Sequence, residues 1–382
     1  MPVYLDHNAT TPLHPQVLEA MMPYITGIYG NPSSVHRYGR LTRDALEQAR
    51  TQVARLVNAE ANQIVFTSGG TEANNLAIKG CLANQSVSRF AVSEIEHASL
   101  LEPSRLMTSS KLSRQWQLDM IPVNTQGQLE VDNLLACLHP DTRLVSVMSA
   151  NNETGVIQDI KNLVAATKVN NAQTVFHSDA CQMLGKQPVN FAELGLDLMS
   201  LSSHKIYGPQ GAGALVVNRS IDLAPQIVGG GQEKQLRSGT ENLAAVVGFG
   251  RAAELAEQML STRQKAVSEL QLQLEQQLQL MQGVEIFSQS VPRLPNTLQF
   301  AMQGIDGEAL LMELDRKGFA VSSGSACDST KTEPSHVLLA MSVPAETARG
   351  AIRVSFGEHN TDEDVSRFVE ALDNIRQQYN LG

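Results

Sequence analysis

The chain has 382 residues, of which 42% are hydrophobic and 18% charged, and its formal net charge is −10. This length exceeds the size at which one hydrophobic core usually stops growing, so we expect two domains. The composition is typical of a globular enzyme, and a negative chain without any Lys/Arg-rich run argues against nucleic acid as a direct partner.

The N-terminus and the cysteines indicate the cellular location of the protein and whether it holds disulfides or a metal. The opening residues 1–6 lack a basic segment followed by an apolar one, and no stretch approaches about 18 consecutive apolar residues. We therefore expect a cytoplasmic protein without membrane contact. The four scattered cysteines are too few for a disulfide framework or a paired zinc site, so we expect no metal.

The first two thirds of the chain predict an α/β domain. Apolar residues recur at helical spacing over residues 41–57, which favours a helix packed on a core. Short apolar runs then alternate with helix-like stretches, and this order predicts a mostly parallel sheet with helices on both faces. The runs are residues 64–66, 89–92, 144–148, 174–176, 198–201 and 214–217.

The pattern changes after about residue 245. A long helical stretch rich in Gln and Leu extends through Gln282, and strand-like pieces follow it. A final helix is expected to start at Thr361, because Asp364 three residues later completes a capping pattern ahead of an apolar stripe. This region predicts a smaller α+β domain.

The first candidate site segment is Thr-Ser-Gly-Gly-Thr-Glu-Ala-Asn at residues 67–74. A strand, a glycine turn and a helix start present unpaired backbone N–H groups that suit a phosphate. Taken alone, an ordinary turn between a strand and a helix is the favoured interpretation.

The second and third segments follow two later strands. Asp179 lies past the run 174–176, where a carboxylate can point into the crevice at the strand ends and keep a pyridinium nitrogen protonated; a helix-capping role is equally compatible. Lys205 lies past the run 198–201 and before a Gly-Pro turn. Backbone placement of this kind suits a lysine that must meet an aldehyde carbon in fixed geometry, and we favour this over a solvated lysine.

The last two segments lie near the C-terminus. Cys327 stands in a small polar stretch, Ser-Ser-Gly-Ser-Ala-Cys, whereas Cys81 and Cys137 suit buried packing. A thiol in such a stretch is accessible as a nucleophile. Arg353 falls on the opposite strand face from Ile352 and Val354 and can bind a carboxylate bidentately, although a lone arginine is more often a surface residue.

In this order, the five segments resemble the cysteine desulfurases of the aminotransferase class V group, within the fold-type I pyridoxal-phosphate enzymes. Ser-His-Lys at 203–205, Arg-Ser-Gly-Thr at 237–240 and the cysteine segment are specific in combination, and segment 322–337 is similar to the long catalytic loop of the iron–sulfur and nitrogenase-maturation subgroup. Ser203 and Asp328 depart from the family pattern, which commonly has Gly and Thr there. Further matching segments are 4–11, 30–36, 96–97 and 151–155.

The resemblance implies the cofactor pyridoxal 5'-phosphate (PLP) and a role for each site residue. Lys205 would condense with the cofactor aldehyde, and Cys327 would accept sulfur. His97 would stack on the cofactor ring and share in the chemistry. The remaining contacts would be Asp179 with the ring nitrogen, Gln182 with the ring hydroxyl, Gly70, Thr71, Ser202 and His204 with the phosphate, Thr240 with the phosphate of a second subunit, Asn152 with cofactor and substrate, and Arg353 with the substrate carboxylate.

The same resemblance implies a large PLP-binding domain with a mostly parallel seven-stranded sheet flanked by helices, at residues 15–255. Residues 1–14 and 256–382 would form the small domain that carries the cysteine loop. A homodimer is implied as well.

The expected function is therefore cysteine desulfurase: sulfur leaves L-cysteine, which becomes L-alanine, and a persulfide on Cys327 passes to an acceptor protein for iron–sulfur cluster assembly or another sulfur-transfer pathway. Two alternatives share the fold, a PLP aminotransferase and a selenocysteine lyase, but neither needs the long cysteine loop. A noncatalytic sulfur carrier would be expected to lack Lys205 or Asp179, and both are present.

Overall fold

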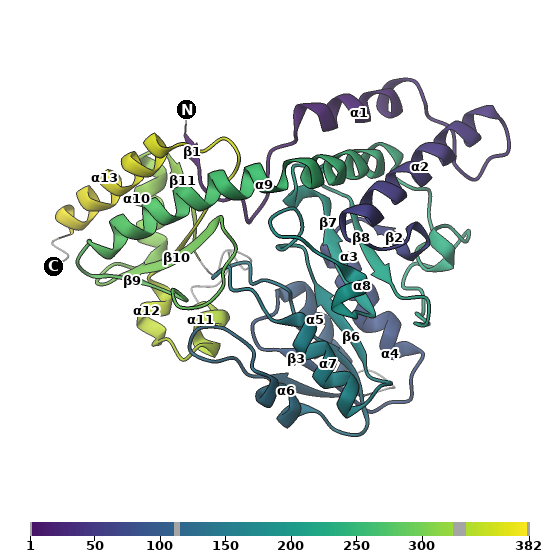
Figure 1. Ribbon diagram of the computed structural model, residues 1–382, viewed down its shortest axis with the longest axis horizontal. Coiled ribbons are helices and arrows are strands. Elements are labelled where there is room, and N and C mark those ends of the chain that lie inside the picture. The colour runs from purple at the N-terminus through teal and green to yellow at the C-terminus, as the bar shows by residue number, and fades with distance from the viewer. Residues whose placement is uncertain (1, 111–114, 324–333, 380–382) are drawn as a thin grey trace.

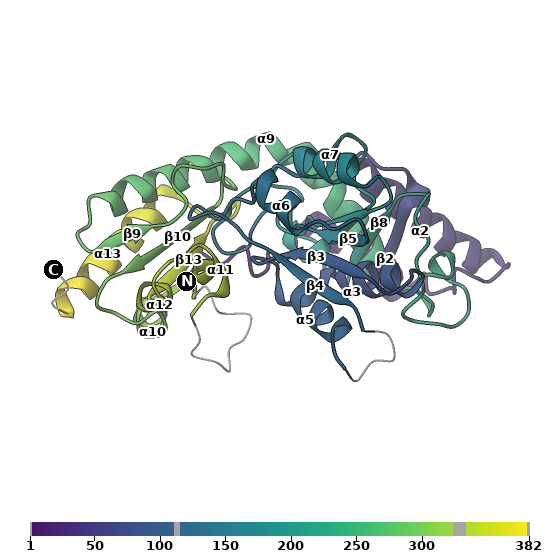
Figure 2. The ribbon, with the colours of Figure 1, turned by 90° about the horizontal axis from the view of Figure 1, so that it is seen from below.

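The computed structural model describes residues 2–110, 115–323 and 334–379. Within these ranges, a large part surrounds a seven-stranded sheet and a smaller part surrounds a four-stranded sheet (Figure 1). Helix α9 (Leu243–Gln279) runs along both parts, as Figure 2 shows from below. In the described ranges, no helix is long and apolar enough to cross a membrane.

The large sheet is mostly parallel, as predicted. Strand β8 runs antiparallel to both of its neighbours, and the other pairs are parallel. In spatial order the strands are β2 (Ile64–Thr67), β8 (Gly213–Val217), β7 (Leu198–Ser202), β6 (Val175–Asp179), β5 (Thr142–Ser146), β3 (Arg89–Ser93) and β4 (Gln117–Ile121).

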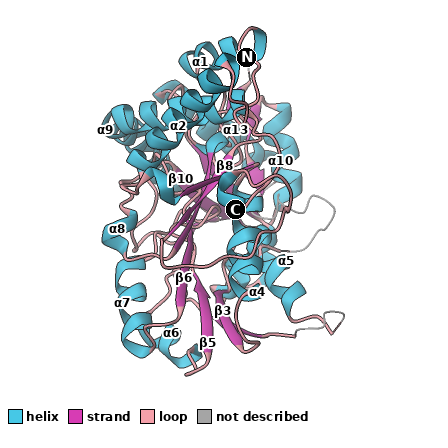
Figure 3. Cartoon of the chain, turned by 90° about the vertical axis from the view of Figure 1, so that its right-hand side faces the viewer, coloured by secondary structure: helices cyan, strands magenta, loops and turns pink. Residues whose placement is uncertain are grey.

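Helices cover both faces of this sheet (Figure 3). Successive strand residues point to opposite faces, so Val65 belongs to one buried cluster and Phe66 to the other. The cluster around Phe66 packs against α1 (Pro15–Thr26), α2 (Arg37–Leu56), α6 (Val131–Cys137), α7 (Ile160–Asn170), α8 (Phe191–Leu194) and α9. The cluster around Val65 packs against α3 (Gly70–Asn75), a π-helical turn (Leu76–Gly80), α4 (Cys81–Ala83) and α5 (Ala98–Met107).

The apolar runs found in the sequence correspond to six of the seven strands, and the stripe at 41–57 corresponds to α2. The seventh strand, β4, was missed. It lies at the sheet edge, where Gln117 is exposed and Asp119 only partly buried, so its sequence lacks the continuous apolar run of a central strand.

The smaller part has its own buried cluster, built on the antiparallel order β12 (Ser322–Ser323), β13 (Ala351–Ser355), β10 (Thr297–Met302) and β9 (Val284–Ile286). A two-stranded sheet pairs β1 (Val3–Tyr4) with β11 (Phe319–Ala320). The remaining helices are α10 (Gly307–Arg316), α11 (His336–Ala340), α12 (Ala345–Arg349) and α13 (Asp362–Gln378).

Helix α13 begins as the sequence predicts. Thr361 is the N-cap, and its hydroxyl accepts a hydrogen bond from Asp364 N while the Asp364 carboxylate accepts one from Thr361 N. The division of the chain into two domains near residue 255 stays a prediction, because α9 passes through that point without a break and contributes to the buried clusters of both parts.

The N-terminal segment crosses between the two parts. Asp6 forms a bridge with Ser355 beside β13, and Thr11 N donates to His204 O just after β7. Residues 6–11 are therefore held between the end of β13 and the C-terminal end of β7, at the edge where open α/β sheets bind their ligands.

Candidate active site

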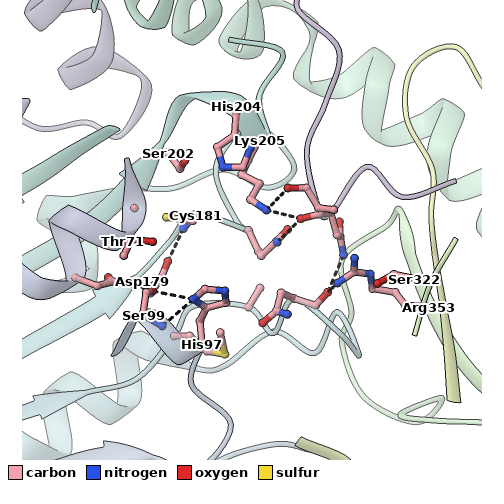
Figure 4. A pocket seen from close by; sticks show the side chains of 18 residues that line it. Thr71, His97, Ser99, Asp179, Cys181, Ser202, His204, Lys205, Ser322 and Arg353 are labelled. Atoms are coloured by element: carbon pink, nitrogen blue, oxygen red, sulfur yellow. Dashed lines mark hydrogen bonds between the residues drawn. The ribbon is translucent and has the colours of Figure 1, made fainter. Parts of the chain in front are cut away.

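A cavity of about 310 Å³ lies at the C-terminal ends of β6 and β7, where the N-terminal segment and β13 meet them. Figure 4 shows Lys205 and His97 pointing into it from opposite sides, with Asp179 at one end and Arg353 at the other. Ten of the residues predicted from the sequence line this one cavity: Gly70, Thr71, His97, Asn152, Asp179, Gln182, Ser202, His204, Lys205 and Arg353.

Asp179 is the last residue of β6, so the strand itself aims its carboxylate at the cavity. Asn74 Nδ2 donates to Asp179 Oδ2 at 2.7 Å, and Cys181 N donates to Asp179 Oδ1 at 2.9 Å. These two bonds fix both oxygens of a buried carboxylate. Asp179, from the second candidate segment of the sequence, thus faces the cavity, and Lys205, from the third segment, does so as well.

Lys205 ends a short 3-10 turn, Ser203–Lys205, that follows β7 directly. Its Nζ donates to the backbone oxygens of Asn8 at 2.5 Å and Ala9 at 2.8 Å. The amine is therefore held by peptide carbonyls of the N-terminal segment, 197 positions away in sequence for Asn8.

The turn before Lys205 accommodates the family departure at Ser203. Ser203 is buried, and a Cβ on Gly208 would lie 2.1 Å from its Oγ. The serine hydroxyl fits because the residue facing it is a glycine. Its Oγ is buried without a hydrogen-bond partner among the described residues.

One end of the cavity offers the groups that a phosphate needs. Gly70 begins α3, and Thr71 follows it, so their backbone N–H groups lie at a helix start. Ser202 Oγ is buried without a hydrogen-bond partner among the described residues. His204 Nδ1 lies 3.1 Å from Thr10 Oγ1, and burial, followed by the charge of Lys205, lowers the pKa of His204 to about 4.

His97 is both a helix cap and a cavity residue. It is the N-cap of α5, and its Nδ1 accepts a hydrogen bond from Ser99 N at 3.1 Å. An accepting Nδ1 places the proton of the neutral ring on Nε2. Burial, with the charges of Lys205 and His336, lowers the pKa of His97 below its usual value, so the ring is uncharged near neutral pH.

The opposite end of the cavity is cationic. Arg353 lies in the middle of β13, where Nη1 donates to Asn152 O at 2.9 Å and Nη2 to Asp6 Oδ1 at 2.5 Å. Arg353 Nε is buried without a hydrogen-bond partner in the described part of the chain. This arrangement suits a substrate carboxylate, which can accept from a guanidinium at more than one nitrogen.

Two predicted residues are not part of this cavity as described. Thr240 is exposed and does not line it. Cys327 falls in 324–333, outside the described residues, although Ser322, five positions before it, does line the cavity.

Sequence reasoning missed the supporting residues Asn8 and Asn74. Both occur in segments that the resemblance had matched, but neither had been given a role. Asn74 carried a usable signal, because it lies one helical turn after Gly70 and therefore on the same side of α3. Asn8 carried no such signal, since its contacts join segments far apart in the chain.

These groups fit PLP. Asp179 can hold the ring nitrogen protonated, and the Lys205 amine can meet an aldehyde. The Ser202 hydroxyl, which has no hydrogen-bond partner within residues 2–110, 115–323 and 334–379, lies beside the α3 start and can bind a phosphate. In the described ranges, no group of His, Cys, Asp and Glu is arranged to hold a metal ion. The fold and the site together define a PLP-dependent enzyme of fold type I.

Within that class the chain belongs to the aminotransferase class-V family, whose model matches residues 3–368. A curated relative from Dictyoglomus turgidum, named cysteine desulfurase IscS, is 42% identical over 376 residues, which cover 98% of this chain and 94% of the relative.

Two solved structures extend the comparison. A NifS-like protein superposes with a TM-score of 0.92 at 34% identity, over 99% of this chain and all of that one. A protein named SspA, solved in complex with cysteine, superposes with a TM-score of 0.80 at 29% identity, over 94% of this chain and all of that one.

Proposed function

We propose that the protein is a cysteine desulfurase that converts L-cysteine to L-alanine and carries the sulfur as a persulfide on Cys327. The proposal rests on one observation: Lys205, Asp179 and Arg353 meet in a single cavity whose wall includes Ser322, five residues before Cys327. The names of the similar proteins agree with it. An aminotransferase or a selenocysteine lyase of the same fold is not favoured.

When bound, PLP supplies an aldehyde that condenses with amines and a ring that withdraws electrons from the substrate Cα. Asp179 keeps the proton on the ring nitrogen, because its carboxylate is fixed by Asn74 and Cys181 N at the strand end. Gln182 and His97 line the same cavity, where Gln182 would bind the ring hydroxyl and His97 would stack on the ring.

Arg353 and Asn152, which line the cavity together with Lys205, orient the substrate by its carboxylate. Lys205 then takes the Cα proton and later returns a proton to the carbon skeleton. The carbonyls of Asn8 and Ala9 hold its amine beside the cavity between these steps.

The sulfur step needs a thiolate. Cys327 Sγ attacks the substrate sulfur, an S–S bond forms, and the bond from Cβ to sulfur breaks with its electron pair left on the carbon side. That side takes up protons and leaves as L-alanine. L-cysteine and a thiol thus give L-alanine and a persulfide with no net oxidation.

A homodimer fits the distribution of exposed apolar side chains. Leu18, Met22 and Ile25 of α1 are each more than 40% exposed, and Tyr38 and Leu41 of α2 are as well. Thr240 is exposed in the single chain and does not line its cavity, which is compatible with a phosphate contact in a second subunit.

The persulfide acceptor is a separate protein, and iron–sulfur cluster assembly is the pathway that the name of the Dictyoglomus relative favours. Transfer to another sulfur pathway and the cytoplasmic location stay predictions.

The direct test uses the PLP-loaded protein with L-cysteine under anaerobic conditions. We expect L-alanine and enzyme-bound persulfide in equal amounts in a first turnover without an acceptor. Formation of pyruvate and ammonia, or of a keto acid from an added amino acid at a higher rate than alanine from cysteine, would overturn the proposal.

A further inference from the structure

A second lysine, Lys186, lies beside the active site and has no role in the chemistry proposed above. It follows β6 by seven residues and lines a small cavity of about 40 Å³ that Lys205 also lines. The two lysines are packed in the same region, so a change in the contacts of Lys186 can alter the position of the Lys205 amine.

Lys186 joins two amide side chains. Its Nζ donates to Asn8 Oδ1 at 2.7 Å and to Gln182 Oε1 at 2.7 Å. Asn8 belongs to the N-terminal segment and Gln182 to the turn after β6, so the amine connects two segments 174 positions apart.

The orientation of both amides follows from their other partners. Asn8 Nδ2 donates to Thr297 Oγ1 at 2.8 Å and to Asn152 O at 3.2 Å, so Asn8 Oδ1 must face Lys186. Gln182 Nε2 donates to the backbone oxygen of Asn8 at 2.9 Å, and a carbonyl can only accept. Both amide oxygens therefore accept from Lys186, and Asn8 Oδ1 also accepts from Asn296 Nδ2 at 3.1 Å.

The backbone oxygen of Asn8 is the point where this network reaches Lys205. It accepts from Gln182 Nε2 and from Lys205 Nζ, and the neighbouring Ala9 O also accepts from Lys205 Nζ. A displacement of the Asn8 peptide would move these two acceptors of the Lys205 amine at once.

A lysine is an unfavourable residue for simple packing here. Burial, with the charges of Lys205 and Arg353, lowers the pKa of Lys186 well below its usual value. No acidic side chain is paired with it among the described residues. An apolar side chain of similar length would avoid this penalty, so an amine at this place needs a reason other than stability.

We propose that Lys186 is a positioning residue: through Asn8 and Gln182 it fixes the peptide carbonyls that receive the Lys205 amine. The inference deepens the proposed function, because the amine so placed is the one that binds PLP and moves the Cα proton. It assigns Lys186 no contact with substrate or cofactor.

The test uses Lys186→Met, which keeps the length and removes the donor. Lys161→Met is the matched control, because Lys161 is exposed on α7 and, among the described residues, forms its ion pair with Glu193 at the surface. The first readout is the rate at which PLP-free protein develops the visible band of lysine-bound PLP after mixing. The second is kcat and KM for alanine formation from L-cysteine.

We expect Lys186→Met to slow the appearance of the band about tenfold and to lower kcat about tenfold, with KM within about twofold, which corresponds to the loss of roughly one hydrogen bond. The melting temperature of the PLP-free protein should stay within about 4 °C of wild type. Rates of Lys186→Met equal to those of Lys161→Met would overturn the inference.

Asn8→Ala keeps the test decisive even where Lys186→Met folds poorly. It removes the Oδ1 acceptor together with the Nδ2 bonds to Thr297 Oγ1 and Asn152 O, and it leaves the backbone oxygen, so it should slow the appearance of the band by at least a similar factor. The double variant should be slowed by less than the product of the two single effects, because both changes break the bond between Lys186 and Asn8. Multiplied effects would mean independent roles and would overturn the inference. If the wild-type protein binds PLP but makes no alanine, the proposed function is wrong. The role of Lys186 can still be tested in that case, because the rate of PLP binding does not depend on alanine formation.

Discussion

Arg353 Nη2 donates a hydrogen bond to Asp6 Oδ1 across 2.5 Å and so joins residues 347 positions apart. The side chains are only 6% and 18% exposed, respectively. Because Arg353 donates from Nη2 to Asp6 and from Nη1 to Asn152 O, the orientation of its guanidinium does not depend on the substrate. Asp6 thus prepares the carboxylate-binding end of the site.

Asp6→Asn should raise KM for L-cysteine about tenfold and change kcat less, because the amide cannot hold the guanidinium by charge. Asp6→Ala should also lower the free energy of unfolding by about 3 kcal/mol, since a buried cation loses its partner. Steady-state kinetics and urea unfolding measure these effects. Asp373→Asn, which removes a surface pair with Arg376 on α13, is the control. An unchanged KM in Asp6→Asn would contradict the role given to Asp6.

Lys205→Ala should abolish the visible band of lysine-bound PLP while leaving the fold intact. The reason is that the Lys205 amine enters the cavity from the turn after β7, where the carbonyls of Asn8 and Ala9 hold it. Absorbance spectra of the reconstituted variant, with circular dichroism as the folding check, measure this. A retained band would assign the cofactor to another lysine.

Cys327→Ala should keep the visible band and lose at least about 100-fold of the rate of alanine formation, because the nucleophile acts after the cofactor has bound. Cys137→Ala is the control, a part-buried thiol whose Sγ lies near Met120 O. Alanine is measured in single-turnover reactions. Normal turnover in Cys327→Ala would remove this residue from the mechanism.

His177 gives the free energy of unfolding a predictable dependence on pH. It is fully buried in β6 between Ser146 Oγ at 2.7 Å and Ser200 Oγ at 3.0 Å, and burial lowers its pKa to about 4. The unfolded chain binds the His177 proton near pH 6.5, and the folded chain does not. The contribution of His177 to the free energy of unfolding is therefore complete above pH 6.5 and is lost as the pH falls from there toward 4.

Between pH 7.5 and 5, this one group should remove about 2 kcal/mol from the free energy of unfolding. Urea unfolding of wild type and His177→Gln at the two pH values isolates the contribution, because the variant lacks it. His359→Gln, at a side chain that is 73% exposed, should behave as wild type. Equal losses in wild type and His177→Gln would refute the assignment.

The parts of the site that the sequence predicted share one property. Asp179, Lys205 and Arg353 each lie in or just after a strand, and the apolar runs that mark those strands are local signals. For Asp179 and Lys205, the parallel pairing of β6 and β7 then brings the C-terminal ends of their strands together, whereas Arg353 comes from the antiparallel sheet of the smaller part. The overall α/β fold followed from the same signals.

The parts that the sequence did not predict depend on contacts between distant segments. Asn8 and Asp6 precede every strand of the large sheet, and their partners Lys205 and Arg353 lie 197 and 347 positions later. No local pattern specifies such a contact. The edge strand β4 was missed for another reason, because partial exposure dilutes its apolar pattern.

Thr240 is the residue whose role depends most on assembly. In the single chain it is exposed and outside the cavity, so Thr240→Ala should leave stability within about 0.5 kcal/mol of wild type. If Thr240 contacts the phosphate in the neighbouring subunit, the same change should weaken PLP binding about tenfold, as expected for a lost hydrogen bond to a charged group.

A mixed dimer decides which subunit supplies Thr240. One chain carries Lys205→Ala and the other Thr240→Ala, and two affinity tags purify the pair. The only lysine-bound PLP then forms in the Thr240→Ala chain, whose site receives an intact Thr240 from its partner. Wild-type PLP affinity at that site is expected, because the threonine acts across the interface. The weakened affinity of the Thr240→Ala homodimer would instead show that each chain supplies its own Thr240, and the contact between subunits would have to be abandoned.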